Sequence, residues 1–413
     1  MIDVVVVGGG PSGLAAASEL GAMGHDVLLL EREDELGGLL NQCIHDGFGT
    51  ILFSESLSGP EFADIFMNRI ERAGVKVRLE TYMRSVEKID DHFVISTVTP
   101  GGVETFESRA LVYAIGCRER NRFEIEIGGT RPAGVFTAGT VQRLVNLYGF
   151  LPGKQPVIVG GGDVGMIVAR HLYLEGVESL LMVYPEDFFS GLPRNAQQCV
   201  LDFDIPYKPR TTVKRIFGDK KVRAVELVEV DKDWNMIEGT EKIYRCDSVI
   251  LSVGLVPYSE KVEELGAEID PATGGPVINE HFETTVDGVF SVGNLIQIFD
   301  YVDDAVKSSY TAAEGVDRFL KGSFDKTRSH TVLKPGEHVK TVTPQRIEYE
   351  GKDEITLFFR PGLEKENVEV RLLGKNGILK SFKKRYVRPS TLEDIKIPKS
   401  VLSGNPEVVI DVR

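Results

Sequence analysis

Residues 2–13 read Ile2-Asp3-Val4-Val5-Val6-Val7-Gly8-Gly9-Gly10-Pro11-Ser12-Gly13, and this stretch decides the fold. Four consecutive valines are typical of a buried parallel strand. Residues 14–23 indicate a helix, and residues 27–30 predict a second strand that ends at Glu31. In such a pattern Gly8 permits a tight turn, Gly10 lets the main chain approach a pyrophosphate, and Gly13 lets the helix pack closely on the strand. Because strand, glycines, helix and acid are in register, we predict a dinucleotide-binding loop with Glu31 positioned to accept hydrogen bonds from ribose hydroxyls.

The same arrangement recurs once, about 150 residues further along the chain. A strand at residues 156–159 precedes Gly160, Gly162 and Gly165, and a helix at 166–174 and a strand at 180–184 follow. The ribose-reading position falls near residues 184–186, where Glu186 favours NADH slightly because an acid repels a 2′-phosphate. A domain kept only for structure, or one that binds another nucleotide, is the alternative.

The remaining segments complete an α/β fold class. Residues 75–115 indicate antiparallel strands that end in a hydrophobic strand at 110–115, and residues 301–320 predict a helix. Beyond residue 325, short alternating runs punctuated by Pro and Gly predict strands. We therefore expect two Rossmann-like dinucleotide-binding domains of three-layer ββα type, followed by a small C-terminal β domain.

Charge is distributed unevenly along the 413 residues, whose formal net charge is −14. From Lys326 onward the chain holds 18 basic and 12 acidic residues, which leaves −20 for residues 1–325. An acidic body repels nucleic acid. No apolar run is long enough to cross a membrane, and we expect neither a secretory signal nor a disulfide framework from four scattered cysteines. The histidines show no metal-ligand spacing. We expect a cytoplasmic protein without a metal site.

In combination, these motifs resemble the flavoproteins with two dinucleotide-binding domains, the group that includes glutathione-reductase-like and thioredoxin-reductase-like enzymes. The matching pieces are the two glycine loops, Gly37-Gly38, Ala114-Ile115-Gly116, the segment 247–257 and the segment 288–294. The resemblance implies FAD in the N-terminal unit and NAD(H) or NADP(H) in an inserted one. It implies an FAD domain at 1–118 and 284–325, an NAD(P)-binding-like domain at 119–283, and the β domain at 326–413.

The resemblance also assigns cofactor-binding residues. For FAD they are Gly8, Gly10, Pro11, Ser12, Gly13, Glu31, Arg32, Gly38, Leu39, Met83, Ala114, Gly116, Gly293, Asn294 and Asp303. For the nicotinamide dinucleotide they are Gly160, Gly162, Asp163, Val164, Gly165, Glu186 and Gly254.

Two departures from the family pattern, and two acids near the predicted helix at 301–320, bear on the chemistry. Asn294 stands where the wider family has an Asp that binds the ribityl chain, and it keeps an acceptor oxygen; the alternative is a turn residue. Asp300 and Asp303 precede or begin the predicted helix at 301–320, where capping is the favoured role. No second cysteine stands at either redox spacing from Cys43, so a dithiol relay is not expected.

Cys43 and His45 are our candidate catalytic residues. One residue separates them, so on a strand their side chains would share a face, which we expect close to the flavin. The functional interpretation is proton transfer or gating of access to the ring. The alternative is packing beside the cofactor.

The segment 42–49, with 293–294 and 300–303, narrows the resemblance to prokaryotic FAD/NAD(P)-dependent subunits. These resemble the small flavoprotein subunits of heteromeric amine or amino-acid (proline, opine) dehydrogenases and the oxidoreductase found alongside glycerol-3-phosphate dehydrogenase. The resemblance implies an electron-passing subunit with a second flavoprotein dehydrogenase subunit as partner, and glycerol 3-phosphate as the first substrate guess. The alternatives are a free-standing NAD(P)H oxidase or diaphorase, an amine or amino-acid dehydrogenase subunit, and a non-catalytic scaffold that holds flavin.

Overall fold

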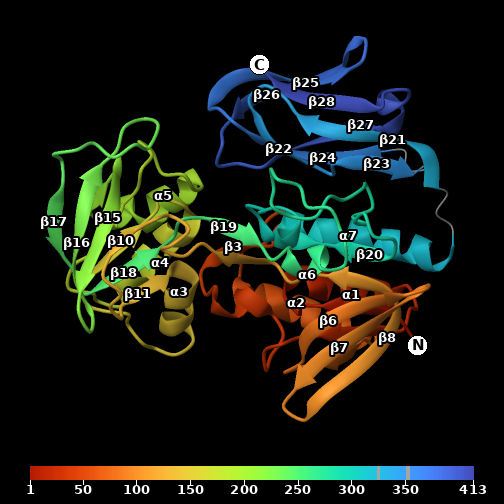
Figure 1. The fold of residues 1–413 in the computed structure, drawn as a ribbon, viewed down its shortest axis with the longest axis horizontal. Coiled ribbons are helices and arrows are strands. Elements are labelled where there is room, and N and C mark those ends of the chain that lie inside the picture. The colour runs from red at the N-terminus through yellow and green to blue at the C-terminus, as the bar shows by residue number, and fades with distance from the viewer. Residues whose placement is uncertain (323–325, 350–353) are drawn as a thin grey trace. The chain divides into compact units, whose positions relative to one another are not determined.

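The computed structural model describes residues 1–322, 326–349 and 354–413. The chain forms two compact units, one made of Met1–Cys117 and Pro257–Arg413 and the other of Arg118–Val256. Figure 1 labels their helices and strands. Among the described residues, no helix is both long and apolar enough to cross a membrane. The predicted fold class is confirmed, since both units contain a parallel sheet with the order expected of a dinucleotide-binding fold.

The sheet of the first unit is built around β1 (Ile2–Val7). This strand pairs in parallel with β2 (Val27–Leu30) and with β8 (Gly102–Tyr113). The sheet continues in parallel to β5 (Lys76–Arg78) and β20 (Val289–Ser291), and antiparallel to β7 (His92–Thr99) and β6 (Tyr82–Ile89). The side chains of Val4, Val5 and Val6 are fully buried, as the continuous apolar run predicts for a strand covered on both faces.

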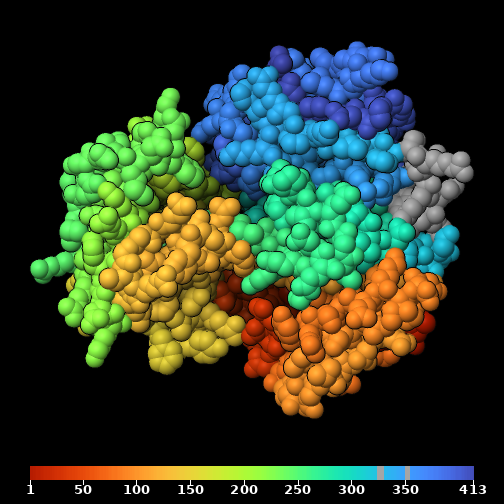
Figure 2. Space-filling model, in the orientation of Figure 1, coloured from red at the N-terminus to blue at the C-terminus, as the bar shows by residue number. Residues whose placement is uncertain are grey.

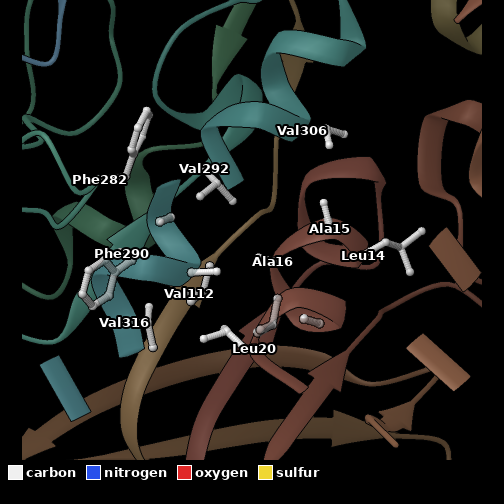
Figure 3. Packing of buried hydrophobic residues seen from close by; sticks show 14 of the residues in the cluster. Leu14, Ala15, Ala16, Leu20, Val112, Phe282, Phe290, Val292, Val306 and Val316 are labelled. Carbon is white, nitrogen blue, oxygen red and sulfur yellow. The ribbon is translucent and has the colours of Figure 1, made fainter. Parts of the chain in front are cut away.

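Three helices cover one face of this sheet: α1 (Pro11–Ala22), α2 (Gly59–Arg72) and α7 (Val302–Leu320). Figure 3 shows Leu20 of α1 near Val112 of β8 and Val316 of α7, in the apolar cluster that also contains Leu14. Buried alanines on α1 let the helices approach closely. Ser58 caps α2 through a capping box with Glu61, so this helix begins where its sequence signal lies.

The second unit repeats the β1-α1-β2 arrangement with β12 (Pro156–Val159), α4 (Asp163–Leu174) and β13 (Leu181–Val183). Its parallel sheet has the order β11-β18-β12-β13-β14, and an antiparallel layer contains β15, β16 and β17. The bounds of the others are β11 (Val135–Thr137), β14 (Tyr207–Lys208), β15 (Thr211–Gly218), β16 (Val222–Glu229), β17 (Lys242–Arg245), β18 (Ser248–Leu251), α3 (Ala138–Asn146) and α5 (Pro193–Cys199).

The C-terminal strands form two sheets around a separate apolar core. One sheet has the order β23-β21-β28-β25-β26 and the other β22-β24-β27. Leu357, Phe359 and Val370 are fully buried between them. The bounds are β21 (Lys326–Pro335), β22 (Val339–Thr343), β23 (Arg346–Tyr349), β24 (Glu354–Pro361), β25 (Lys365–Gly374), β26 (Gly377–Val387), β27 (Glu393–Pro398) and β28 (Glu407–Val412).

The β domain is joined to residues 268–300 by polar contacts, and Figure 2 shows the two in direct contact. Arg360 donates from its guanidinium to the Asp300 carboxylate at 2.9 Å and to the carbonyl of Ile298 at 3.0 Å. Here the structure differs from the predicted domain boundary at 283, because residues 257–283 belong to the first unit. The reason is long-range pairing: Ile278, for example, accepts the main-chain N–H of Gln345.

We predict that Lys399→Met destabilises the chain. Lys399 donates to Glu280 at 2.9 Å, and the Glu280 side chain is 0% exposed, so the variant removes a cationic partner from a buried carboxylate. Loss of one partner of a buried pair lowers the free energy of unfolding by about 3 kcal/mol, measurable by urea denaturation. The control is Lys334→Met, which removes the exposed Lys334–Glu407 pair and costs less than about 1 kcal/mol. Equal losses in the two variants would contradict this account.

Candidate functional site

The first glycine loop connects β1 to α1, and two of its glycines are required by the protein itself. Gly8 has a φ of +105°, a conformation that favours glycine, and its N–H donates to the Leu30 carbonyl at 2.8 Å. A Cβ added at Gly13 would overlap the carbonyl oxygen of Gly8. These two positions therefore fix the tight turn and the close contact between α1 and β1 that the sequence predicts.

Gly10 is different, because nothing in the protein requires a glycine there. Its φ of −77° and ψ of −175° are open to any residue, and an added Cβ would meet no protein atom within 4 Å. The space above Gly10 is the cradle that a close-approaching phosphate needs. The residues present therefore fit a dinucleotide at this loop.

The N-terminus of α1 supplies the electrostatics of this cradle. The first helical hydrogen bond runs from Leu14 N to the Gly10 carbonyl at 2.9 Å, so the N–H groups of Ser12 and Gly13 come before it. No side chain caps this helix. An uncapped helix N-terminus presents N–H donors and a positive dipole end to an anion.

Glu31 lies at the end of β2, buried against the loop. Its carboxylate accepts the N–H of Gly9 at 2.6 Å and that of Glu33 at 2.9 Å. Gly37 donates to the Gly9 carbonyl at 2.9 Å, and a Cβ at Gly38 would lie 3.0 Å from Gly10 Cα. The structure thus brings Glu31, Gly38 and Gly10 together. Sequence reasoning missed the hydrogen bond from Gly37. Gly37 has a φ of +107°, a conformation that favours glycine, and the Gly37-Gly38 pair is the sequence feature that reflects this conformation.

The returning segment also reaches this loop. A Cβ at Gly293 would overlap Ser12 Oγ, so the two residues are adjacent. Ala114 donates to the Val7 carbonyl at 2.8 Å at the end of the central strand. Gly116 has a φ of +69° and no protein atom near its Cβ position. Gly293 and Ala114 therefore lie next to the loop and the strand before it, and binding of FAD by these residues and by Gly116 stays a prediction.

Four other predicted FAD residues have different surroundings. Met83 is buried in an apolar cluster with Val5 and Val7. The exposed Arg32 side chain lies 3.4 Å from Glu33. Leu39 is exposed on the 3₁₀ turn η1 (Gly38–Gln42), and Pro11 is the first residue of α1. Binding of FAD by these residues stays a prediction.

Asn294 has the surroundings of a turn residue. Its side-chain oxygen accepts the N–H of Phe299 at 3.0 Å, closing the turn that follows the short helix η3 (Gly293–Leu295). This hydrogen bond uses one of the two acceptor lone pairs of the amide oxygen. The turn alternative has direct geometric support, and the ribityl contact stays a prediction.

Asp303 does not have the capping role that we expected, and its contact with FAD stays a prediction. It is fully buried, and its carboxylate accepts the N–H groups of Gly49, Ile51 and Leu52 at 3.2, 3.1 and 2.9 Å. No side chain caps α7. Asp303 therefore fixes the loop at residues 49–52 to the start of α7, and Asp300 is held by Arg360, so neither caps the helix.

Cys43 and His45 do not lie on a strand, so the shared-face argument is wrong. Cys43 ends the turn η1, where its N–H donates to the Leu40 carbonyl at 3.0 Å, and its side chain is buried. His45 Nδ1 lies 3.0 Å from the carbonyl oxygen of Asp46, and the His45 ring is tilted against that of Phe48, with 5.1 Å between the ring centroids. The 3₁₀ turn breaks the alternation on which the expectation rested. A catalytic role for the two residues stays a prediction.

In the second glycine loop, as in the first, the fold requires glycine at two positions and leaves open space at a third. Gly160 has a φ of +113° and no room for a Cβ, and Gly165 would carry a Cβ only 3.0 Å from the Gly160 carbonyl. Gly162 has an unstrained backbone, and the nearest atom to its Cβ position is Ser190 Oγ at 3.8 Å. Gly254 at the end of the neighbouring strand segment is also open. This loop too fits a dinucleotide.

The other predicted residues at this site have the following surroundings, and their binding of a nicotinamide dinucleotide stays a prediction. The Asp163 carboxylate accepts the N–H of Leu192 and the amide of Asn195, both at 2.7 Å, and so holds the segment at 190–195. Val164 packs on the apolar core. Glu186 is half-buried, three residues beyond the end of β13. No group of three or more metal-ligating side chains occurs in the part of the chain that the structure describes.

Comparisons with known proteins agree with this geometry. Residues 2–313 match the family profile "Pyridine nucleotide-disulphide oxidoreductase". The thioredoxin reductase of Listeria innocua is 27% identical over 297 residues, covering 71% of this chain and 85% of that protein. The glutamate synthase [NADPH] small chain of Escherichia coli is 24% identical over 348 residues, covering 77% of this chain and 68% of that protein.

Solved structures give the same result. The thioredoxin reductase of Lactococcus lactis has a TM-score of 0.66 at 25% identity and covers 78% of this chain and 100% of that chain. An L-proline dehydrogenase from P. horikoshii has a TM-score of 0.55 at 20% identity and covers 77% of this chain and 55% of that chain, which shows a shared fold.

We predict that Gly10→Ala weakens FAD binding without unfolding the chain. The added methyl occupies the phosphate cradle and meets no protein atom, so the apoprotein keeps its stability within about 1 kcal/mol. Loss of one charged hydrogen bond costs about 1.5–3 kcal/mol, or about 10- to 100-fold in the dissociation constant. Fluorescence titration of apoprotein with FAD measures it. Unchanged FAD affinity would contradict the assignment.

We predict that Asp303→Asn loosens the loop at residues 49–52. The amide has one acceptor oxygen where the carboxylate has two and a charge, so three loop N–H groups lose part of their hydrogen bonding. Hydrogen exchange at these amides should accelerate by about tenfold or more. The control is Asp304→Asn, one residue along the helix, where the carboxylate pairs with Lys307 at 3.0 Å. Equal exchange in both variants would refute the role of Asp303.

Proposed function

The chain belongs to the pyridine nucleotide-disulphide oxidoreductase family and is an FAD-dependent oxidoreductase that uses a nicotinamide dinucleotide, and we propose that it is a free-standing NAD(P)H oxidoreductase of the oxidase or diaphorase type. The observation that carries this proposal is the pair of open glycines. Gly10 and Gly162 each leave a cradle that the protein does not fill and that a diphosphate would. Two such loops support two dinucleotides, one per unit.

The residues of the chain have defined tasks in this scheme. Bound FAD would supply the capacity to accept a hydride from a nicotinamide and to release two electrons singly or as a pair. The main-chain amides at the start of α1 bind the diphosphate, and Glu31 orients the ribose. Asp303 keeps the loop at 49–52 in place beside α7. In the second unit the amides at the start of α4 bind the nicotinamide dinucleotide.

The acceptor in this proposal is not a protein disulfide. The four cysteines, Cys43, Cys117, Cys199 and Cys246, are far apart in the sequence, so neither redox spacing of the disulfide reductases is present. Disulfide exchange requires a thiolate that attacks and a second thiol that resolves. A small diffusible acceptor, such as oxygen or a quinone-like dye, needs no dithiol, and this supports an oxidase or diaphorase.

A second candidate function is an electron-passing subunit of a heteromeric dehydrogenase. It is favoured by the fold shared with a proline dehydrogenase chain and by the basic β domain, with a charge of +6 from residue 326 onward, which suits an acidic partner. Under this alternative the partner subunit oxidises glycerol 3-phosphate, or an amine or amino acid. A flavin-holding scaffold without catalysis is the third candidate.

Anaerobic mixing of the FAD-loaded chain with NADH or NADPH tests these candidates. The proposal predicts rapid loss of the yellow flavin absorbance and fast turnover when oxygen or a dye is admitted. Rapid bleaching with slow turnover would favour the electron-passing subunit. Bleaching by neither nucleotide would overturn the proposal and favour the scaffold or a flavin reduced by its partner.

We predict that Gly162→Val separates the two loops. The side chain enters the second cradle, where the nearest protein atom is 3.8 Å from the Cβ position, so the fold and the bound FAD are retained. Reduction of the flavin by a nicotinamide dinucleotide should slow by about 100-fold, because phosphate hydrogen bonds are lost, while chemical reduction by dithionite stays unchanged. Stopped-flow absorbance measures both. Unchanged reduction by the nucleotide would show that the second loop does not bind the donor.

A further inference from the structure

The two units can be compared with each other at the edge where a dinucleotide ribose is read. In the first unit, Glu31 at the end of β2 accepts the N–H of Thr81 at 2.8 Å through its carbonyl. Two residues along, the carbonyl of Glu33 accepts the N–H of Glu80 at 2.8 Å. Glu80 has a φ of +49°.

The second unit repeats these hydrogen bonds at the same spacing. The carbonyl of Tyr184 accepts the N–H of Thr211 at 3.0 Å, and the carbonyl of Glu186 accepts the N–H of Arg210 at 2.9 Å. Arg210 also has a φ of +49°. The repeated pattern therefore aligns the two edges residue by residue.

A third pair of bonds completes the alignment. Gly37 donates to the Gly9 carbonyl at 2.9 Å, and Ser190 donates to the Gly161 carbonyl at 3.0 Å. Each donor comes six residues after the strand-end residue. The aligned positions are Glu31 with Tyr184, Glu33 with Glu186, Asp34 with Asp187, and Glu80 with Arg210.

The aligned edges differ first at the strand end. Glu31 places a carboxylate against Gly9, whereas Tyr184 places a buried aromatic ring against Gly161. The ring of Tyr184 lies 5.0 Å from that of Phe189 and 6.3 Å from that of Tyr207, measured between centroids. In the second unit, aromatic packing thus stands in place of the acid that we expect to read ribose hydroxyls in the first unit. The candidate ribose-reading residues of the second unit are the more exposed positions Glu186, Asp187 and Arg210, which we call the rim.

The rim carries two acids and one cation at the aligned positions. Arg210 is the cation suited to a 2′-phosphate, and its guanidinium donates to Asp187 at 3.0 Å, with both side chains more than half exposed. The hydrogen bond from Arg210 holds the pKa of Asp187 below its usual range, so Asp187 is ionised at neutral pH. Glu186 adds a second negative charge. At these three aligned positions two acids stand beside one cation, and that cation already has a carboxylate partner.

We propose that the second site selects NADH over NADPH, with Glu186 and Asp187 as the residues that determine specificity. A dianionic 2′-phosphate is repelled by Glu186 and must compete with Asp187 for Arg210. An adenosine ribose with its 2′-hydroxyl instead offers a donor to the rim carboxylate of Glu186. The proposal rests on the proposed function, since it names the nucleotide of that same site.

Calorimetric titration of the FAD-loaded chain with ADP-ribose and with 2′-phospho-ADP-ribose tests it without catalysis. We expect ADP-ribose to bind about tenfold more tightly than 2′-phospho-ADP-ribose at low salt. This gap, the ratio of the two dissociation constants, should become smaller as salt rises. Glu186→Gln and Asp187→Asn should each reduce the gap by about threefold. The matched control is Asp34→Asn, at the aligned position of the first unit, which should leave the gap unchanged.

The outcomes separate this inference from the proposed function. Equal binding of both ligands, tighter binding of the 2′-phosphate, or a gap that neither variant narrows would overturn the selectivity while leaving a nicotinamide site in place. An equal effect of Asp34→Asn would overturn the assignment to the second site. If neither ligand binds and neither NADH nor NADPH bleaches the flavin, the proposed function fails together with the inference.

Discussion

The binding edge of the first unit depends on how closely α1 lies against β1. A Cβ at Gly13 would overlap the Gly8 carbonyl, so only glycine lets the helix begin directly above the strand end. That contact places the uncapped N–H groups of Ser12 and Gly13 where a diphosphate can be held. The same close packing keeps the loop next to the end of β2, so the carboxylate of Glu31 accepts the N–H of Gly9.

The glycines of the two loops fall into two physical classes. The fold itself requires glycine at positions 8, 13 and 160, because a side chain there would strain the backbone or overlap a neighbour. The fold does not require glycine at positions 10 and 162, which have ordinary backbone angles and open space, so a ligand is the better explanation for them. The second class is the stronger functional evidence, because folding alone supplies no reason to keep glycine at a position where alanine would also fit.

The sequence predicts both loops and their flanking strands because these depend on local sterics and on continuous apolar runs. It does not predict the surroundings of Asp303, whose partners lie more than 250 residues away in sequence. The shared-face argument for Cys43 and His45 is wrong because Cys43 ends a 3₁₀ turn, which no local sequence pattern predicts. The segment 257–283 was assigned to the inserted domain because its tie to the β domain, such as Ile278 to Gln345, is also long-range.

The β domain lies beyond the residues that match the family profile. Its hydrogen bonds nevertheless reach Asp300, just before the start of α7. Arg360 and the main chain of Leu392 bind the Asp300 carboxylate at 2.9 and 2.5 Å. Three residues further along, Asp303 binds the loop at 49–52. Two carboxylates three residues apart therefore anchor different segments at the start of α7. Asp300 binds the β domain and Asp303 binds the loop at 49–52, so both segments are tied by buried or half-buried charges to the same end of one helix.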